Sequence, residues 1–326
     1  MLTMRFRLPL FAVLLATLGL AGCSGVRYAE APPLAFEDID YGYEVDYALD
    51  APRLAYNDEG EGDATLLLVH GLASNAGFWR YNIDALADAG YRVIAVDLPG
   101  FGKSSKGAYP YDMTFYARTV SRFIEELDLG EVIYVGHSMG GQVGLTLALR
   151  RPDQIERLVL AAPAGIEAFD EGEGAWLANV LTEEGIAKAP EEAIRANLAM
   201  NFHRWDADRL EWMVEERARM AKSDEMDEFA YAVLRSVHGM IDEPTTPFLS
   251  EVTVPTFVVY GQYDGLIPNP YLHPGTPRGV FAPGVEAIPD AELVEIPDAG
   301  HMLMIERPEA FNEAVLDYLR QEGVTS

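Results

Sequence analysis

The sequence predicts an α/β protein whose mainly parallel sheet is covered by helices on both faces. Apolar runs rich in β-branched residues alternate with amphipathic helical segments along most of the chain. With 326 residues and 49% hydrophobic content, the chain can bury one large sheet and still carry an insertion. Between residues 163 and about 252 the strand pattern stops, which predicts an all-helical insertion between two strands.

The expected elements follow in chain order. An antiparallel pair is expected first, at Glu44–Ala48 and Arg53–Tyr56. The remaining strands are expected at Thr65–His70, Arg92–Asp97, Val132–Gly136, Arg157–Ala161, Thr256–Gly261 and Leu293–Ile296. Core helices are expected at Gly77–Ala89, Phe115–Leu127, Met139–Arg150 and Pro308–Arg320, and insertion helices at Glu173–Glu184, Pro190–Asn201, Ala207–Lys222 and Met226–Met240. The stretch Asn269–Pro289, rich in Pro and Gly, is interpreted as a rim loop.

One pentapeptide indicates a catalytic turn. The residues Gly136-His137-Ser138-Met139-Gly140 form a G-x-S-x-G pattern between an expected strand and an expected helix. In that setting the serine occupies a strained turn, and small flanking residues let the helix approach the strand closely. In a chain with 29 glycines the pentapeptide alone is more often a loop, so the interpretation depends on its context.

A serine needs a histidine base and an orienting carboxylate to act as a nucleophile near neutral pH. Asp264 and His301 follow Ser138 in the required order, and each comes just after an expected buried strand. Asp298 is an alternative acid, although a turn-forming role suits it better. His70 and His137 are interpreted mainly as packed histidines bonded to the backbone, with substrate orientation as the alternative.

Further motifs carry a resemblance to the α/β-hydrolases with a helical cap, over about residues 60 to 322. Leu67-Leu68-Val69-His70-Gly71 resembles the oxyanion-hole strand of that family, and Asp97–Ser104 resembles its D-x-P-G-x-G-x-S turn. Gly261–Asp264 with Pro268, and Gly300-His301 with Glu306 and Pro308, resemble its acid and histidine blocks.

The resemblance implies a mainly parallel sheet of the eight-stranded α/β-hydrolase type with an all-helical cap. It also implies that Ser138 is the nucleophile, His301 the general base and Asp264 the orienting acid. The backbone N–H groups of Leu72 and Met139 would then form the oxyanion hole. A serine at this position argues against the members of the family that use an aspartate nucleophile.

Metals and cofactors are not expected. His203, His238 and His273 lack metal-ligand spacing and clustered carboxylate partners, and a single cysteine cannot build a thiolate zinc site. The expected ligand is a small-molecule acyl substrate.

The N-terminus is interpreted as an export signal. Arg5 and Arg7 precede an apolar stretch that is too short to cross a bilayer comfortably, and Leu20-Ala21-Gly22-Cys23 resembles a bacterial lipobox. Residues 1–22 are therefore expected to be a lipoprotein signal peptide, with lipidation at Cys23 and anchoring in the cell envelope, at the outer membrane or facing the periplasm. The expected division continues with a tether over residues 23–40, core over 41–163, cap over 164–250 and core over 251–326.

The chain is strongly acidic, with a net charge of −28 and only four lysines. Such a field repels nucleic acid, so nucleic-acid binding is not expected. Acidity with few lysines favours a halophilic protein, because salt screens the self-repulsion; a generic acidic surface is the alternative. The oligomeric state stays open.

The leading hypothesis is a carboxylic ester hydrolase of esterase or lipase type, acting on monoacyl lipids among other esters. Carbon–carbon bond hydrolysis, amidase or aminopeptidase action and cofactor-free perhydrolysis would use the same triad, and a binding lipoprotein without activity is the alternative from another class. Apolar cap residues are interpreted mainly as packing and secondarily as a substrate pocket; they are Trp176, Leu177, Leu181, Met200, Phe202, Trp205, Trp212 and Met213.

Overall fold

The computed structural model describes residues 26–321 and 323, and its core is one eight-stranded sheet. The strand order is β1-β2-β4-β3-β5-β6-β7-β8. The strands are β1 (Asp46–Ala48), β2 (Leu54–Glu59), β3 (Thr65–Val69), β4 (Arg92–Val96), β5 (Val132–His137), β6 (Ile155–Ala161), β7 (Thr256–Gly261) and β8 (Ala291–Ile296). Strand β2 pairs antiparallel with β1 and β4, and the other pairs are parallel, which confirms the predicted mainly parallel sheet.

The central strands consist almost entirely of apolar residues because both of their faces are buried. Every residue of β3, β5 and β7 is buried, because helices cover both faces of the sheet. Strand β8 forms an edge of the sheet and is mostly half-exposed.

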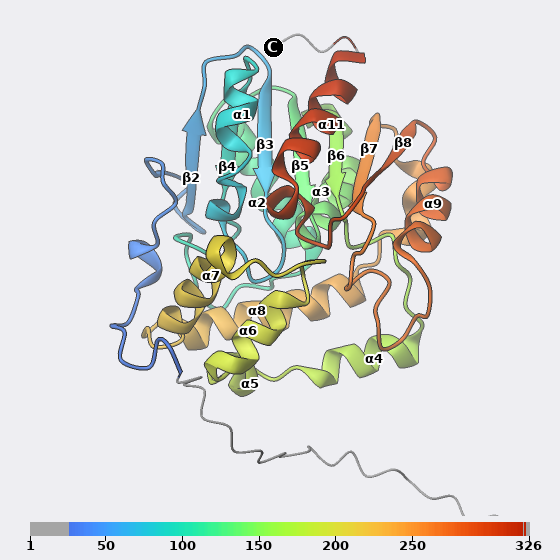
Figure 1. Cartoon of the computed structure of the whole chain (residues 1–326). Coiled ribbons are helices and arrows are strands. Elements are labelled where there is room, and N and C mark those ends of the chain that lie inside the picture. Colours follow the sequence, from blue (N-terminus) through green and yellow to red (C-terminus); the bar gives the residue numbers. More distant parts are fainter. Residues whose placement is uncertain (1–25, 322, 324–326) are drawn as a thin grey trace, which may run out of the picture.

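The core helices lie on the two faces of the sheet (Figure 1). Helices α1 and α11 contact each other on one face, and α2 packs against α3 on the other. Their bounds are α1 (Ile83–Asp88), α2 (Met113–Glu126), α3 (Met139–Arg150), α9 (Pro277–Ala287), α10 (Leu303–Glu306) and α11 (Pro308–Gln321).

The segment between β6 and β7 is helical and lies beyond one end of the sheet (Figure 1). Its helices are α4 (Glu171–Val180), α5 (Glu183–Ala187), α6 (Glu191–Ala199), α7 (Ala207–Met220) and α8 (Met226–Asp242). We call these five helices the cap. In the described part of the chain, no helix combines the length and the apolar character that crossing a bilayer requires.

Three expected elements differ from the structure. The single helix expected at Glu173–Glu184 is divided into α4 and α5, because Leu181 is extended and the Thr182 side chain caps the start of α5. The helix expected at Gly77–Ala89 is a 3-10 turn, η2 (Ala76–Trp79), followed by the short helix α1. The rim loop expected after the acid is a loop only until Thr276, whose side chain caps α9. Pro277 opens this helix at a position where a proline costs no hydrogen bond, whereas Pro283 lies inside the helix and removes one donor.

The described part of the segment expected to be a tether is held against the folded domain at several points. Between residues 26 and 40, Phe36 is fully buried, and its ring centroid lies 5.4 Å from that of Phe229 of α8. Lys222 Nζ donates to three main-chain carbonyls of this segment at 2.6–2.8 Å, and Tyr28 N–H donates to Glu191 of α6 at 2.8 Å. The segment therefore belongs to the folded domain, while residues 1–25, with Cys23 and the expected signal peptide, lie outside the described residues.

Packing of this segment predicts a large stability effect at Phe36. Phe36→Ala is expected to lower the free energy of unfolding by about 3–5 kcal/mol, because it leaves a cavity against α8. Urea denaturation of both proteins measures the difference. Phe248→Ala, at a phenylalanine that is 47% exposed, is the control and is expected to cost less than about 1 kcal/mol. Equal, small effects would mean that the segment is a loose tether.

Candidate active site

Ser138 occupies the turn between β5 and α3. Its φ of 51° and ψ of −117° are a left-handed conformation, which is strained for a residue with a side chain. The neighbouring strand holds the turn, because the Ser138 N–H donates to the Ala161 carbonyl at 3.0 Å. The Ser138 carbonyl accepts from the N–H groups of Gly141 and Ala164 at 2.9 and 3.0 Å. Ser138 is half-buried although both of its neighbours in sequence are buried. It lies at the carboxyl end of β5, in the centre of the sheet.

The two glycines of the pentapeptide are sterically required. A Cβ atom at Gly136 would lie 2.5 Å from the Gly140 carbonyl oxygen. A Cβ atom at Gly140 would lie 2.5 Å from the Val69 carbonyl oxygen of β3. Both distances are shorter than real contacts allow, so α3 can approach the sheet this closely only with glycine at both positions.

Asp264 and His301 form a buried pair, and they follow the carboxyl ends of β7 and β8. His301 Nδ1 lies 2.8 Å from Asp264 Oδ2, and the side chains are 3% and 0% exposed. The other carboxylate oxygen, Oδ1, accepts from the main-chain N–H groups of Leu266 and Ile267 at 2.8 and 3.0 Å. Because the carboxylate only accepts when ionised, His301 donates through Nδ1, which leaves Nε2 free to take up a proton.

The His301 loop is fixed beside the Ser138 turn. His137, the residue before Ser138, donates from Nε2 to the His301 carbonyl at 3.1 Å, and the two rings lie 4.8 Å apart. On the other side, Glu306 accepts from the N–H groups of Gly300 and His203 at 2.7 and 3.0 Å. His203 belongs to the connection between α6 and α7, so the cap helps to hold the histidine loop.

Burial keeps two nearby histidines neutral. The pKa of His137 lies well below its usual range because of burial, with a smaller contribution from His301. Burial also lowers the pKa of His70 to about 4, although its bond to the Gly71 carbonyl opposes the shift. His70 Nδ1 donates to that carbonyl at 2.7 Å, and Nε2 accepts from Leu98 N–H at 3.0 Å. Both rings thus bond to the backbone, as the sequence interpretation favours.

Two side chains of α7 hold the loop after β3, and the sequence analysis missed them. Arg217 Nη2 donates to the carbonyl of Ala73, a residue with φ 55°. Glu216 Oε1 accepts from Asn75 Nδ2 at 2.9 Å. The loop includes Leu72, the expected oxyanion donor. Since these partners are more than 140 residues apart in sequence, no local pattern could reveal them.

Arg217 is unusual because its guanidinium is buried. Burial lowers its pKa to about 10, an effect that Glu216 partly opposes. The guanidinium carbon lies 4.6 Å from the centre of the Phe229 ring. The Arg217 guanidinium therefore lies beneath the loop after β3, where it contacts the Ala73 carbonyl and the face of the Phe229 ring.

Other candidates from the sequence lie elsewhere. Asp298 is exposed in a turn with φ 52°, and the carboxylate bonded to His301 is that of Asp264. His203 stacks on Tyr263 at 4.0 Å, and His238 bonds to the Ala178 carbonyl. The oxyanion donors expected at Leu72 and Met139 lie on the loop after β3 and in the first turn of α3, where helical N–H groups lack partners.

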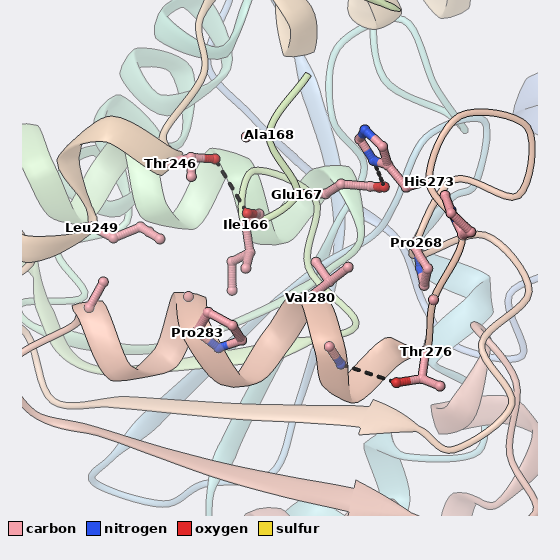
Figure 2. A pocket seen from close by; sticks show the side chains of 15 residues that line it. Ile166, Glu167, Ala168, Thr246, Leu249, Pro268, His273, Thr276, Val280 and Pro283 are labelled. Carbon is pink, nitrogen blue, oxygen red and sulfur yellow. Dashed lines mark hydrogen bonds and ion pairs between the residues drawn. The ribbon is translucent and has the colours of Figure 1, made fainter. Parts of the chain in front are cut away.

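The expectation that His273 lacks clustered carboxylates is wrong. Its Nδ1 lies 2.6 Å from Glu167 and its Nε2 lies 3.2 Å from Glu173, two cap-side residues about 100 positions earlier (Figure 2 draws the Glu167 bond). Bonding to Glu167 is the main cause that raises the pKa of His273, and Glu173 adds to it. Across the described ranges, 26–321 and 323, no group of three such side chains could hold a metal ion.

A cavity of about 420 Å³ lies beside this cluster, between the start of the cap and α9 (Figure 2). Ile166, Leu249, Val280 and Pro283 give it an apolar wall, and His273 stands at its side. Ser138, Asp264 and His301 do not line it, so it is separate from the catalytic candidates.

The family follows from this geometry together with sequence comparison. The model of the alpha/beta hydrolase fold family matches residues 64–308, which include Ser138, Asp264 and His301. The chain belongs to the alpha/beta hydrolase fold family. It is accordingly a hydrolase of this fold.

Curated relatives differ in their reactions. The chain is 32% identical over 279 residues to the dihydrolipoyllysine-residue acetyltransferase component of an acetoin cleaving system from Pseudomonas putida, covering 80% of this chain but only 65% of that protein. It is 28% identical over 278 residues to a 2-hydroxy-6-oxononadienedioate/2-hydroxy-6-oxononatrienedioate hydrolase from Escherichia coli K12, covering 82% and 91% of the two chains.

Solved structures share the fold. A probable hydrolytic enzyme from Pseudomonas aeruginosa PAO1 is similar with a TM-score of 0.78 and 30% identity, over 91% of this chain and 100% of that one. A thermophilic esterase from Thermogutta terrifontis is similar with a TM-score of 0.69 and 25% identity, over 85% and 98%. The hydrolase therefore has esterase-like neighbours as well as a carbon–carbon bond hydrolase among its relatives.

The raised pKa of His273 predicts a pH-dependent contribution to stability. The bond to the two glutamates stabilises the fold fully below the ordinary histidine pKa of about 6.5 and is lost as pH rises through the raised value. His273→Gln is therefore expected to lower Tm more at about pH 6 than at about pH 9.

Thermal unfolding of both proteins across this range measures the effect. The double variant Glu167→Gln/Glu173→Gln should lose the same pH-dependence, since it removes both partners. A Tm difference that is constant from acid to alkaline pH would contradict the prediction.

The α7 contacts predict that Arg217 positions the loop after β3. Arg217→Met is expected to lower kcat by about ten- to a hundred-fold with a smaller change in KM. The reason is that the loop carries the Leu72 N–H, and displacing this expected oxyanion donor weakens binding of the transition state more than binding of the substrate. Steady-state kinetics on a hydrolysed substrate gives both constants. Arg217→Lys should recover part of kcat, and Arg235→Met, at an exposed arginine of α8, should leave both constants unchanged. Normal kcat in Arg217→Met would overturn this role.

Proposed function

We propose that this protein is a serine hydrolase that cleaves carboxylic esters through an acyl-enzyme on Ser138. The observation that carries the proposal is the left-handed Ser138 turn at the end of β5, beside the buried His301–Asp264 pair. A serine held in this way, with a histidine whose Nε2 is free, has the requirements for nucleophilic attack on a carbonyl.

In this mechanism His301 Nε2 accepts the Ser138 proton as Oγ attacks the acyl carbonyl carbon. Asp264 keeps His301 in the tautomer with Nδ1 protonated and stabilises the imidazolium that forms. The N–H groups of Leu72 and Met139 stabilise the oxyanion, and His301 returns the proton to the leaving alcohol. Water then attacks the acyl-enzyme by the same route and releases the acid.

Ester hydrolysis is favoured over the alternatives by the esterase that shares the fold at 25% identity. The second candidate is carbon–carbon bond hydrolysis. It is favoured by the Escherichia coli relative, which this chain matches over 91% of that enzyme's length. The triad chemistry is common to both, so a panel of substrates separates them. Amide cleavage and perhydrolysis would use the same residues.

We further propose that the hydrolase is exported and held in the cell envelope by a lipid on Cys23. The support is the sequence of the first 23 residues, in which an apolar stretch ends in Leu-Ala-Gly-Cys. Cys23 is the only cysteine in the chain, so it has no disulfide partner within it. Two or more acyl chains at Cys23 would anchor the protein stably, whereas a single chain would not.

The triad predicts the loss of turnover on substitution. Ser138→Ala is expected to lower kcat for p-nitrophenyl esters by about 10⁴-fold or more, and Asp264→Asn by on the order of 10³–10⁴. Hydrolysis of esters from acetate to palmitate measures these losses and the preferred chain length. Asp298→Asn replaces the exposed alternative carboxylate and should leave turnover unchanged.

Two outcomes of this assay would contradict the proposal. Ester turnover retained in Ser138→Ala would exclude Ser138 as the nucleophile. Labelling of Ser138 by a serine-directed phosphonate without turnover of any ester would favour carbon–carbon or amide cleavage instead.

Repeating the assay up to molar salt tests the halophilic hypothesis, which predicts that activity and Tm rise with salt because charge repulsion is screened.

Lipidation predicts membrane attachment that depends on Cys23. Cys23→Ala, expressed in a bacterium, is expected to leave the membrane fraction, since the acyl chains supply the anchoring energy. Fractionation followed by mass spectrometry of the N-terminal peptide measures both location and modification. A wild-type chain with unmodified Cys23 would contradict the anchor.

A further inference from the structure

The cap carries exposed apolar side chains that the core does not need. Trp176 and Val180 of α4 are 41% and 53% exposed, and Leu181, directly after α4, is 39% exposed. The other face of α4 packs on α8, where Gly174 is buried against Ile241. Trp176, Val180 and Leu181 therefore face away from the protein interior.

The stretch of sequence that forms this surface contains no charged residue. Residues 175–181 read Ala-Trp-Leu-Ala-Asn-Val-Leu, between Glu173 and Glu183. In a chain with 52 acidic residues, a solvent-facing run of this kind is not a generic soluble surface. Its composition suits an apolar partner.

A second segment extends the surface. Tyr271, in the loop after β7, is 71% exposed, and its ring lies 6.1 Å from that of Trp176. We call Trp176, Val180, Leu181 and Tyr271 the cap patch. Trp and Tyr are the side chains that favour the interface between lipid headgroups and acyl chains, because their rings are apolar with one polar group.

The start of the described chain lies at the same end of the molecule. Val26, itself 48% exposed, borders a cavity of about 240 Å³ together with Ala187 and Lys188, at the end of α5. Helix α5 begins two residues after Leu181, so this one short helix connects Leu181, at the end of the cap patch, to the cavity that Val26 borders. In Figure 1 the blue start of the coloured ribbon meets the cap beside α5, at the end farthest from the sheet.

Chain length then limits how far a lipid could be from the cap. Cys23 and Val26 are three residues apart, and an extended chain covers at most about 3.6 Å per residue. A lipid on Cys23 would therefore hold the bilayer surface within about 11 Å of Val26. The packing of residues 28–40 on α6, α7 and α8 leaves no slack beyond Val26 to move the domain away.

We propose that the cap patch docks on the lipid bilayer that holds the Cys23 anchor, with Trp176 at the depth of the headgroups. This inference rests on the proposed anchor. We expect this bilayer face to be zwitterionic, because Glu171 and Glu183 are exposed beside the patch and anionic headgroups would repel them. Docking places the cap next to lipid and gives the hydrolase access to esters dissolved in the membrane.

Fluorescence quenching tests the docking directly. The full chain, purified with its anchor, is reconstituted into phosphatidylcholine vesicles whose acyl chains carry bromine, which quenches only nearby tryptophans. Of the four tryptophans, Trp176 is the most exposed, and Trp79 is fully buried. Bromolipid is expected to quench the wild type, and Trp176→Phe is expected to lose most of that quenching. Trp205→Phe, at a tryptophan packed on Phe202, is the matched control and should keep it.

Activity supplies an independent test. The triple variant Trp176→Ser/Val180→Ser/Leu181→Ser is expected to lose at least about five-fold in turnover of esters embedded in vesicles, because the apolar contact with lipid is removed. Turnover of soluble p-nitrophenyl acetate should stay unchanged, because these three side chains are exposed on the outer face of the cap, a position that does not fit the substrate-pocket alternative for Trp176 and Leu181.

The outcomes separate this inference from the others. Quenching that is equal in wild type and Trp176→Phe, or absent in both while Cys23 carries lipid, would overturn the docking and leave the anchor intact. Quenching at Trp176 without lipid on Cys23 would uphold the patch and reject the anchor. Protection of Trp176 from a soluble quencher in the absence of vesicles, with a concentration-dependent dimer, would mean that a second copy of the chain covers the patch. Loss of soluble ester turnover in Ser138→Ala reports on the reaction alone.

Discussion

The left-handed backbone of Ser138 is the constraint on which the rest of the site depends. Such a conformation costs about 1–3 kcal/mol for a residue with a side chain, so the surrounding structure must impose it. Strand β6 and helix α3 do so through hydrogen bonds to both the N–H and the carbonyl of Ser138. The close approach of α3 to β3 and β5 in turn requires glycine at 136 and 140. The exposed serine is therefore a consequence of how tightly one helix packs on the sheet.

The cap is bound into this site by polar contacts as well as by packing. Arg217 and Glu216 hold the loop after β3, and Glu306 holds the histidine loop against the connection between α6 and α7. The N-terminal segment in turn packs on the cap, through bonds to Glu191 of α6 and to Lys222 just after α7. Changes in the cap would thus reach the reacting groups through the loops on either side of Ser138.

Electrostatics divides the histidines of the molecule into distinct roles. Burial keeps His70 and His137 neutral, so they act as fixed hydrogen-bonding groups that shape the turns around Ser138 and His301. His273 has the opposite environment, because two carboxylates favour its charged form at the junction of the cap and the acid loop. The chemistry proposed for His301 depends on its one strong partner, Asp264, and on a second ring nitrogen left free.

The sequence by itself determined the sheet, because periodicity and burial act locally: the expected central strands lie within about two residues of β3 to β8. It also gave the order of Ser138, Asp264 and His301, since each follows a strand whose carboxyl end must reach one sheet edge. The sequence did not predict the elements whose structure depends on a helix cap or on contacts between distant residues. Thr276 turns a Pro- and Gly-rich loop into α9, and residues 28–40 pack on the cap although nothing in their composition requires it. The pairing of Arg217 with Ala73, the cluster around His273 and the meeting of Trp176 with Tyr271 were decided only by the tertiary structure, because these partners are about 95 or more residues apart and no local pattern links them.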